Sequence, residues 1–191
     1  MVDRPGDAVY GAAPVRRADR VWRAFEANEV THSAAHYLLA IGALSKAPEP
    51  PRAADVARHL GVSRAAVSLQ LRNLEAQRLV KLAPDQRLHL THSGADLVAR
   101  IAGKREVVLQ LLRDVLGVPP RRAEMDACKV EHLLSEETGA ALVHLLRFLR
   151  SDHPAARTFL KAYREAIGDC DEEETCEFCT TRCLLRAGQT R

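Results

Sequence analysis

The sequence predicts a mainly α-helical protein, and three observations support that class. The chain has 191 residues, of which 47% are apolar and only 4% are aromatic. Ala, Leu, Val and Arg are abundant, which favours helices over a β-sandwich. Apolar residues also recur at helical spacing along most of the chain. A chain of this length can bury a substantial core, so we expect one medium domain, or a domain with an appendage.

The first 44 residues predict a flexible lead-in followed by a long helix. Pro and Gly residues are frequent in residues 1–15, which favours irregular structure. From Val21 to Leu44 the apolar residues return at roughly helical spacing, until the segment KAPEPP stops the pattern. The N-terminus lacks the pattern of a signal peptide, and no apolar stretch is long enough to span a bilayer. We therefore expect a cytoplasmic protein with no membrane partner.

The next segment predicts a winged helix-turn-helix. One helix, at about 52–60, ends at Gly61, and a second begins at Ser63 as N-cap and continues to about Gln77. The segment LVKLAPDQRLHLT then alternates apolar and polar residues around PDQ, as a two-stranded hairpin does. Helix, turn, helix and hairpin together make a winged helix. We expect a further helix after the hairpin, with Ser93 as its N-cap.

Four helical segments are expected in the second half of the chain. The helix that begins after Ser93 continues through VVLQLLRDVLGV until Gly117, Pro119 and Pro120 break it. RRAEMDACKVEHLLS and EETGAALVHLLRFLR each read as a further helix, and Pro154 restarts a helix over AARTFLKAYREAIG. The predicted fold is therefore an N-terminal winged helix-turn-helix, a helical dimerisation domain and a short Cys-rich C-terminal motif. The corresponding ranges are a flexible N-terminus at 1–15, the DNA-binding domain at 16–92, the metal-binding and dimerisation domain at 93–167, and the Cys-rich motif at 168–191.

Charge points to double-stranded DNA as a partner of the winged helix. The net charge is +3, but residues 52–105 contain ten Lys or Arg against four acids, so this segment carries +6. The polar side chains expected to face DNA from the second helix and the wing are Ser63, Arg64, Ser68, Gln70, Arg72 and Arg87. A single winged helix reads only a short half-site, so we expect a homodimer on a two-fold operator, joined by the helices after residue 105.

A second group of residues suggests a metal site. Cys128, Glu131 and His132 are three and four residues apart, which places them on neighbouring turns of one helical face. A thiolate, a carboxylate and an imidazole that converge in this way can hold a divalent ion. The alternative is a buried Cys beside two ordinary surface residues.

These segments, in this order, resemble the DtxR/MntR family of metal-activated transcriptional repressors over about residues 31–150. The segments that carry the resemblance are HYLLAIGAL, the winged helix, LLRDVLGV and above all DACKVEHLLSEE. The resemblance implies one metal site, with His36 of the first helix joining Cys128, Glu131 and His132. Relatives usually have Met or Asp at the position of His36. This ligand set is borderline-soft, and the resemblance favours Fe(II) over other divalent transition metals.

The sequence also departs from the family pattern at a second, ancillary metal site. The positions that supply that site in relatives carry Arg105, Leu109 and Glu124 here. Arginine and leucine do not bind a cation, so we expect this site to be lost, with Arg105 paired to Glu124. We also expect this protein to lack the large C-terminal SH3-like domain that some relatives have.

The C-terminal segment CDEEETCEFCTTRC predicts a second centre. Cys170, Cys176, Cys179 and Cys183 have the spacing C-x5-C-x2-C-x3-C, within an acidic stretch that carries seven acids and no base over residues 165–177. Four thiols so close together can wrap a [4Fe-4S] or [2Fe-2S] cluster, with zinc as the alternative ion. A redox pair at Cys176 and Cys179 alone is the simpler interpretation, although it leaves two cysteines without a role.

Together these patterns predict a metal-responsive, iron-sensing transcriptional repressor with an additional Fe-S cluster or metal centre in its tail. No nucleophile-and-base pairing and no phosphate loop is visible, so we expect a protein that is not an enzyme. Two alternatives remain open at this point: a small Fe-S redox or electron-transfer protein built on a winged-helix scaffold, and a metal-independent regulator of the MarR type.

Overall fold

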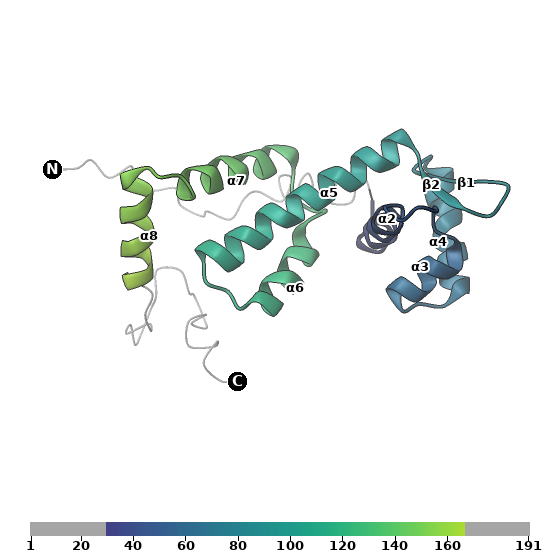
Figure 1. The fold of residues 1–191 in the computed structure, drawn as a ribbon, viewed down its shortest axis with the longest axis horizontal. Coiled ribbons are helices and arrows are strands. Elements are labelled where there is room, and N and C mark those ends of the chain that lie inside the picture. Colours follow the sequence, from purple (N-terminus) through teal and green to yellow (C-terminus); the bar gives the residue numbers. More distant parts are fainter. Residues whose placement is uncertain (1–29, 167–191) are drawn as a thin grey trace, which may run out of the picture. The chain divides into compact units, whose positions relative to one another are not determined.

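The computed structural model describes residues 30–166 and shows a mainly helical fold with one small sheet (Figure 1). The chain divides into two compact units, Met1–Leu142 and Val143–Arg191. The predicted lead-in at 1–15 and the four-cysteine motif lie outside the described residues. Within residues 30–166, no helix combines the length and apolar character that a bilayer crossing needs.

The first described helix, α2, covers His32–Leu44. Thr31 is its N-cap, because the Thr31 side chain accepts a hydrogen bond from the backbone N–H of Ala34. The expectation of one unbroken helix from Val21 is therefore wrong at Thr31, where the backbone is extended. Apolar spacing alone cannot show this break, because the helical repeat continues across it. Six of the thirteen residues of α2 are buried. The helix packs against α3 (Ala53–Leu60), α4 (Arg64–Ala76), α5 (His92–Gln110) and β2 (Leu88–Leu90).

The helix-turn-helix forms as the sequence predicts. Helix α3 covers Ala53–Leu60 and ends at Gly61, whose φ of 67° lies in the left-handed region that glycine tolerates best. Helix α4 covers Arg64–Ala76, and the Ser63 side chain caps it by accepting a hydrogen bond from the Ala66 N–H. The inward faces of these helices join α2 and the wing in one core, whose fully buried members include Leu38, Ile41, Val56, Val67, Leu74 and Leu88.

The wing is a two-stranded antiparallel hairpin. Strand β1 (Val80–Leu82) pairs with β2 (Leu88–Leu90), with Lys81 opposite His89 in the register. The following helix, α5, covers His92–Gln110. Its N-cap is Thr91 and not Ser93 as expected, because Thr91 Oγ1 accepts a hydrogen bond from the Gly94 N–H at 3.0 Å. The same hydroxyl donates to the Arg78 carbonyl at 2.7 Å, so this cap also ties the helix to the wing.

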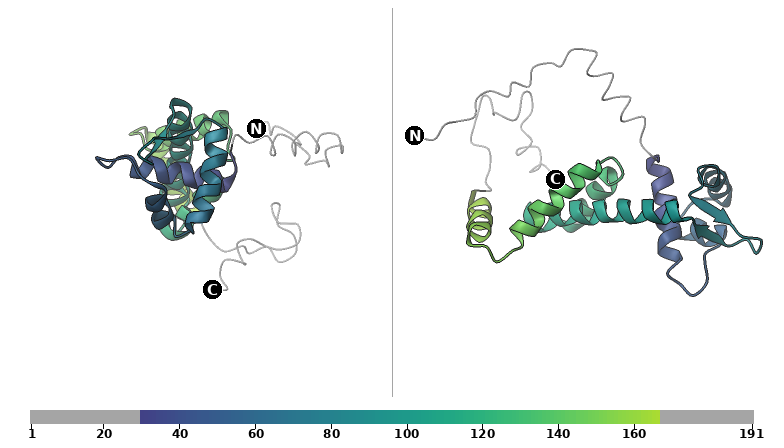
Figure 2. Two further views of the ribbon diagram at one scale, coloured as in Figure 1. Left: turned by 90° about the vertical axis from the view of Figure 1, so that its right-hand side faces the viewer. Right: turned by 90° about the horizontal axis from the view of Figure 1, so that it is seen from above.

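A long helix connects the winged helix to the segment that carries Cys128. Helix α5 continues into a short π-helical turn, η1 (Leu111–Val115), and the chain then turns at Gly117, whose φ is 69°. Helix α6 covers Pro120–Val130 and packs against α5 and η1. Figure 1 shows α6 along the distal part of α5, and Figure 2 shows α2 crossing α5 nearer the winged helix.

Helices α7 (Glu136–Leu149) and α8 (Pro154–Ala166) follow, as the sequence predicts. Lys104 of α5 holds the start of α7, because its ammonium group donates to the Leu134 carbonyl at 2.8 Å and lies 3.2 Å from a carboxylate oxygen of Glu136. In the second unit, several large apolar side chains are exposed, including Val143, Leu145, Phe148 and Phe159.

Two glycines of α5 provide a matched test of this packing. A Cβ at Gly94 would lie 1.9 Å from the Leu79 carbonyl oxygen, whereas a Cβ at Gly103 would meet nothing within 4 Å. We expect Gly94→Ala to lower the free energy of unfolding by about 3 kcal/mol, because backbone must move to relieve the clash. Gly103→Ala should raise it by about 0.5–1 kcal/mol through helix propensity. Urea denaturation measures both, and equal effects of the two substitutions would contradict this account.

Candidate metal centre

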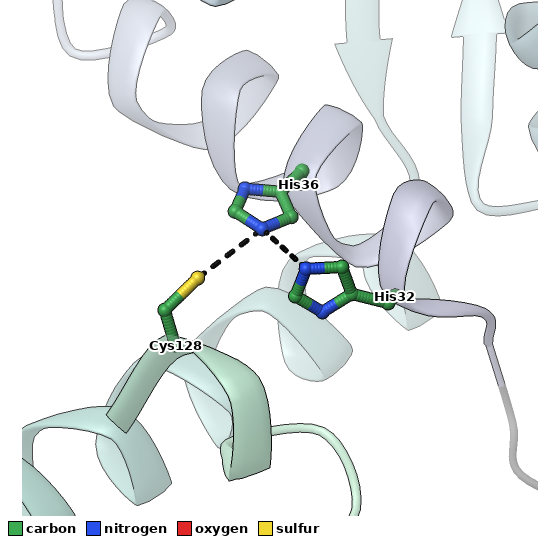
Figure 3. Close-up of side chains that lie close together, drawn as sticks. All are labelled: His32, His36 and Cys128. Atoms are coloured by element: carbon green, nitrogen blue, oxygen red, sulfur yellow. Dashed lines mark hydrogen bonds between the residues drawn. The ribbon is translucent and has the colours of Figure 1, made fainter. Parts of the chain in front are cut away.

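The centre forms where α2 meets the C-terminal end of α6. The Nε2 atom of His36 lies 3.2 Å from Cys128 Sγ, although the two residues are 92 positions apart in the chain. His36 lies on the second turn of α2, and Cys128 lies in the last turn of α6. Both side chains are half-buried. The structure therefore brings together two of the four residues that the sequence selects as metal ligands (Figure 3).

A third donor at the centre is His32, which the sequence analysis missed. His32 Nε2 lies 3.1 Å from His36 Nε2, and one donor atom from each of His32, His36 and Cys128 lies within 4.8 Å of the others. Figure 3 shows both imidazoles, from successive turns of α2, facing the thiol of α6. The signal was present in the sequence, because His32 and His36 are four residues apart and thus share a helix face.

Glu131 is a fully buried acid beside this cluster. Its side chain is 0% exposed, and neither carboxylate oxygen has a hydrogen-bond partner. The Nε atom of Arg105 lies 3.7 Å from one of these oxygens, a distance that gives an ion pair without a hydrogen bond. Arg105 therefore pairs with Glu131 and not with Glu124 as expected. Glu124 is exposed on α6, whereas a buried carboxylate has the greater need of a cation.

The fourth expected ligand, His132, lies just beyond α6. The expected helix over residues 121–135 is too long, because α6 ends at Val130 and residues 131–134 form a turn. His132 Nδ1 lies 3.5 Å from His32 Nδ1, and the two rings are tilted against each other with centroids 4.8 Å apart. His132 thus approaches the cluster through His32.

Burial shifts the pKa of four side chains at the centre in the direction that favours their neutral forms. These side chains are His36, Cys128, Glu131 and His132. Burial raises the pKa of Glu131 against the opposing charge of Arg105, and it raises the pKa of the Cys128 thiol together with the nearby Glu131 carboxylate. Burial lowers the pKa of His36, helped by His32 and Arg105. It likewise lowers the pKa of His132, helped by His32 and His36. The imidazoles therefore keep a lone pair available at neutral pH.

The donors present fit a divalent transition metal. Glu131 is not one of the three donors that lie within 4.8 Å of one another, but its buried carboxylate has only the ion pair with Arg105 and no hydrogen bond within residues 30–166. A cation nearby would offset the cost of burying this charge. Imidazole nitrogen and thiolate sulfur suit iron, zinc, cobalt and nickel better than manganese, which prefers oxygen donors. The three clustered donors therefore form a candidate transition-metal site.

The expected DNA-facing residues occupy two different settings. Arg64, Ser68 and Arg72 are exposed and four residues apart, so they form one stripe along α4, whereas Gln70 is half-buried and belongs to another face. Ser63 and Ser68 already bond within the helix, Ser63 as the cap and Ser68 by donating to the Arg64 carbonyl at 3.0 Å.

Arg87 lies in the turn that connects the two strands of the wing, directly before β2, and is held there by several partners. Its guanidinium donates to the Pro50 carbonyl at 2.8 Å and pairs with Glu49, and its Nε lies 3.3 Å from an Asp85 oxygen. Its side chain is 21% exposed. These contacts join the wing to the segment before α3, so the role of Arg87 in the structure is at least partly to hold the wing in place.

Comparisons with known proteins agree with the fold and find related families for two segments of the chain. Residues 91–158 match the family described as iron dependent repressor, metal binding and dimerisation domain, and residues 27–87 match the MarR family. Neither family model reaches the four-cysteine segment. These matches confirm the resemblance to iron-dependent repressors that the sequence predicts.

The chain is also similar to individual proteins that are named as repressors. The chain is 32% identical over 119 residues to the iron-dependent repressor IdeR of Mycobacterium tuberculosis, which covers 62% of this chain and 52% of that protein. It is 31% identical over 111 residues to the diphtheria toxin repressor of Corynebacterium diphtheriae, covering 58% and 49% respectively. The crystal structure of T. acidophilum IdeR superposes with a TM-score of 0.52 at 25% identity and covers 65% of this chain and 58% of that chain. The chain thus spans about half the length of the curated relatives it matches.

The titration of Cys128 makes metal binding dependent on pH. Its raised pKa leaves a thiol at neutral pH, and the thiol must lose its proton before sulfur binds a cation. We expect the affinity for Co(II) or Fe(II) to rise with pH from about 6 to about 8, by about tenfold per unit for each proton released. Competition with a chelator at several pH values measures this slope. An affinity that does not change over this range would show that the thiol takes no part.

Glu131 should oppose stability without metal and favour metal binding. Because its folded pKa is raised, its negative charge disfavours the fold once the pH exceeds the pKa of the unfolded carboxyl. We expect Glu131→Gln to stabilise the metal-free protein by about 1 kcal/mol and to weaken metal binding. Thermal unfolding with and without Co(II) measures both effects. The control is Glu124→Gln, an exposed position on the same helix that should change neither quantity.

Proposed function

We propose that the protein is a metal-dependent, iron-sensing transcriptional repressor that binds double-stranded DNA as a homodimer. The observation that carries this proposal is the 3.2 Å approach of His36 on α2 to Cys128 on α6. Helix α2 belongs to the core of the winged helix, whereas α6 packs on the distal part of α5. A cation held by both helices therefore links the DNA-binding module to the helices that follow it.

The metal centre in this proposal consists of His36, Cys128, Glu131 and His132. A bound ion supplies a positive charge that thiolate, carboxylate and imidazole groups from two helices share. Fe(II) is the proposed physiological metal, since the relative from Mycobacterium tuberculosis is named an iron-dependent repressor and a soft sulfur donor disfavours manganese. When α2 and α6 are held together, the angle between α2 and α5 is restricted. Metal would thus raise the population of the DNA-competent arrangement, by as much as the metal binds that arrangement more tightly than the others.

DNA recognition in this proposal belongs to α4. Arg64, Ser68 and Arg72 face solvent as one stripe, and arginine can contact either phosphates or the O6 and N7 atoms of guanine. Ser63, Gln70 and Arg87 complete the set expected from the sequence, with Ser63 at the start of α4, where backbone N–H groups also favour phosphate. The surrounding segment of +6 charge supports the same partner.

The dimer in this proposal uses the helices after residue 105. The large apolar side chains Leu116, Met125, Val130 and Leu133 are at least 36% exposed in the single chain. Apolar side chains grouped in one segment favour contact with another protein surface. The matched family model for residues 91–158, which is described as a dimerisation domain, supports the same assignment.

We also propose that the tail cysteines Cys170, Cys176, Cys179 and Cys183 bind an Fe-S cluster, or zinc as the alternative. Only their spacing in the sequence supports this part of the proposal. Anaerobic purification with an absorption spectrum and analysis of iron, sulfide and zinc tests it. A brown protein with iron and sulfide in equal amounts supports an Fe-S cluster. A colourless protein with one extra zinc per chain overturns the cluster and supports the zinc alternative.

DNA binding should depend on Fe(II) through Cys128. Binding to a random-sequence DNA pool is selected with the wild-type protein and Fe(II), and the enriched sequence then serves as the probe. We expect Fe(II) to tighten binding to this probe by about tenfold or more, and Cys128→Ala to abolish that gain. Fluorescence anisotropy under anaerobic conditions, with and without a chelator, measures the affinity. Affinity that is insensitive to chelation would favour a metal-independent regulator of the MarR type.

The arginines of α4 should contribute to DNA affinity both with and without bound metal. We expect Arg64→Ala to weaken binding by about 1–3 kcal/mol if it reads a base, and to reduce the salt dependence of binding if it contacts a phosphate. Arg121→Ala, which removes an exposed arginine from α6, is the matched control. Absence of salt-dependent DNA binding in every variant and in the wild type would favour the redox-protein alternative.

A further inference from the structure

We propose that His32 is a direct ligand of the metal, through Nε2, on the solvent-facing side of the centre, and that His132 orients His32. This inference rests on the proposed function and changes the membership of the metal centre. It does so because His32, and not His132, lies with His36 and Cys128 in the group of donors that are close enough to share one ion.

The distances between donors match those around one tetrahedral ion. Typical metal–nitrogen and metal–sulfur bonds of about 2.0 and 2.3 Å place two nitrogens about 3.3 Å apart and a nitrogen and a sulfur about 3.6 Å apart. The structure has 3.1 Å between the Nε2 atoms of His32 and His36, and 3.2 Å between His36 Nε2 and Cys128 Sγ. The third pair, His32 and Cys128, also has donor atoms within 4.8 Å of each other, so all three donors lie near the spacing that one shared ion requires.

The local structure explains why His32 is in place before any ion binds. His32 is the first residue of α2, and the cap made by Thr31 fixes where that helix begins. His36 follows one turn later, so both rings lie on the same face of α2. His32 is exposed whereas His36 is half-buried, which places His32 on the outer side of the pair.

The contact between His32 and His132 assigns different roles to the two rings. Their Nδ1 atoms are 3.5 Å apart, and a neutral imidazole carries a proton on only one of its nitrogens. If His32 Nδ1 carries the shared proton, His32 Nε2 has a free lone pair that faces His36 and Cys128. His132 Nδ1 then accepts the hydrogen bond, and the His132 proton is on Nε2. His132 is in this case a positioning residue, like the groups that orient metal-bound histidines elsewhere.

This arrangement has a consequence for metal selection. His32, His36 and Cys128 provide two nitrogens and one sulfur, and Glu131 provides a carboxylate that Arg105 already partly neutralises. A set of this kind favours Zn(II), Co(II), Ni(II) and Fe(II) over Mn(II) and Mg(II). An additional imidazole on the solvent side also takes a position that water would otherwise occupy.

Co(II) titration of the full-length chain with Cys170, Cys176, Cys179 and Cys183 all replaced by Ser tests the inference without any need for DNA. The wild-type centre and every variant below are compared in this background, because the tail thiols would otherwise give a sulfur-to-cobalt band of their own. In the wild type we expect a sulfur-to-cobalt charge-transfer band together with intense d–d bands, which are typical of four-coordinate cobalt. His32→Ala should weaken Co(II) binding by at least about tenfold, and water in the vacated position should lower the d–d intensity. The charge-transfer band should remain, since Cys128 is intact. His89→Ala, which removes an exposed histidine from β2, is the control and should match the wild type.

Two comparisons separate the possible outcomes. If His36→Ala and Cys128→Ser lose Co(II) whereas His32→Ala keeps the affinity and spectrum of the wild type, the role of His32 is overturned and the proposed function stands. If Cys128→Ser also keeps the wild-type affinity and spectrum, the proposed function itself fails. X-ray absorption of the wild type and of His132→Ala gives a measurement that does not depend on His32 variants folding. Two bound imidazoles in both proteins support the inference, and loss of one in His132→Ala overturns it.

Discussion

The contact between His36 and Cys128 is the interaction on which the arrangement of the centre depends. Each residue belongs to a helix that is positioned for other reasons: α2 by burial in the winged-helix core, and α6 by packing against α5 and η1. Neither helix needs the other for its own packing, yet their donor atoms meet at 3.2 Å. A contact with these properties can respond to an ion without loss of either core, and this is the physical requirement for a sensor that folds in both states.

The buried pair of Glu131 and Arg105 complements that contact. A carboxylate that is fully buried without a hydrogen bond destabilises the fold, and the guanidinium at 3.7 Å offsets only part of that cost. An unsatisfied polar group of this kind typically indicates a functional site, because packing alone would select an apolar residue there. The same two residues show how a substitution can rewire a site. Arg105 occupies a position that the resemblance to metal-activated repressors assigns to an ancillary metal site, and it pairs with Glu131 of the proposed centre.

Much of the fold could be predicted from the sequence, because its signals are local. Gly61, Ser63, the alternation around PDQ and Pro154 each determine a turn, a cap or a helix start through the geometry of one or two residues. The errors arose where two local signals competed. Thr91 and Ser93 are both good caps, and only the contact of Thr91 with the wing decides between them. The place of His32 at the centre was not predicted, although its spacing from His36 puts both rings on one helix face, because only the position of Cys128 in space shows that this face meets a third donor.

The π-helical turn at Leu111–Val115 has a consequence for how the chain reaches the centre. The Leu116 N–H donates to the Leu111 carbonyl at 3.0 Å, five residues back, so this turn holds one more residue than an α-helical turn. The extra residue rotates the exit of the helix, and thus changes the direction in which the backbone departs toward α6. The direction of the Cys128 thiol therefore depends on the number of residues in this turn as well as on their chemistry. An insertion or deletion in this turn would change the geometry of the proposed sensor, while every donor atom stays the same.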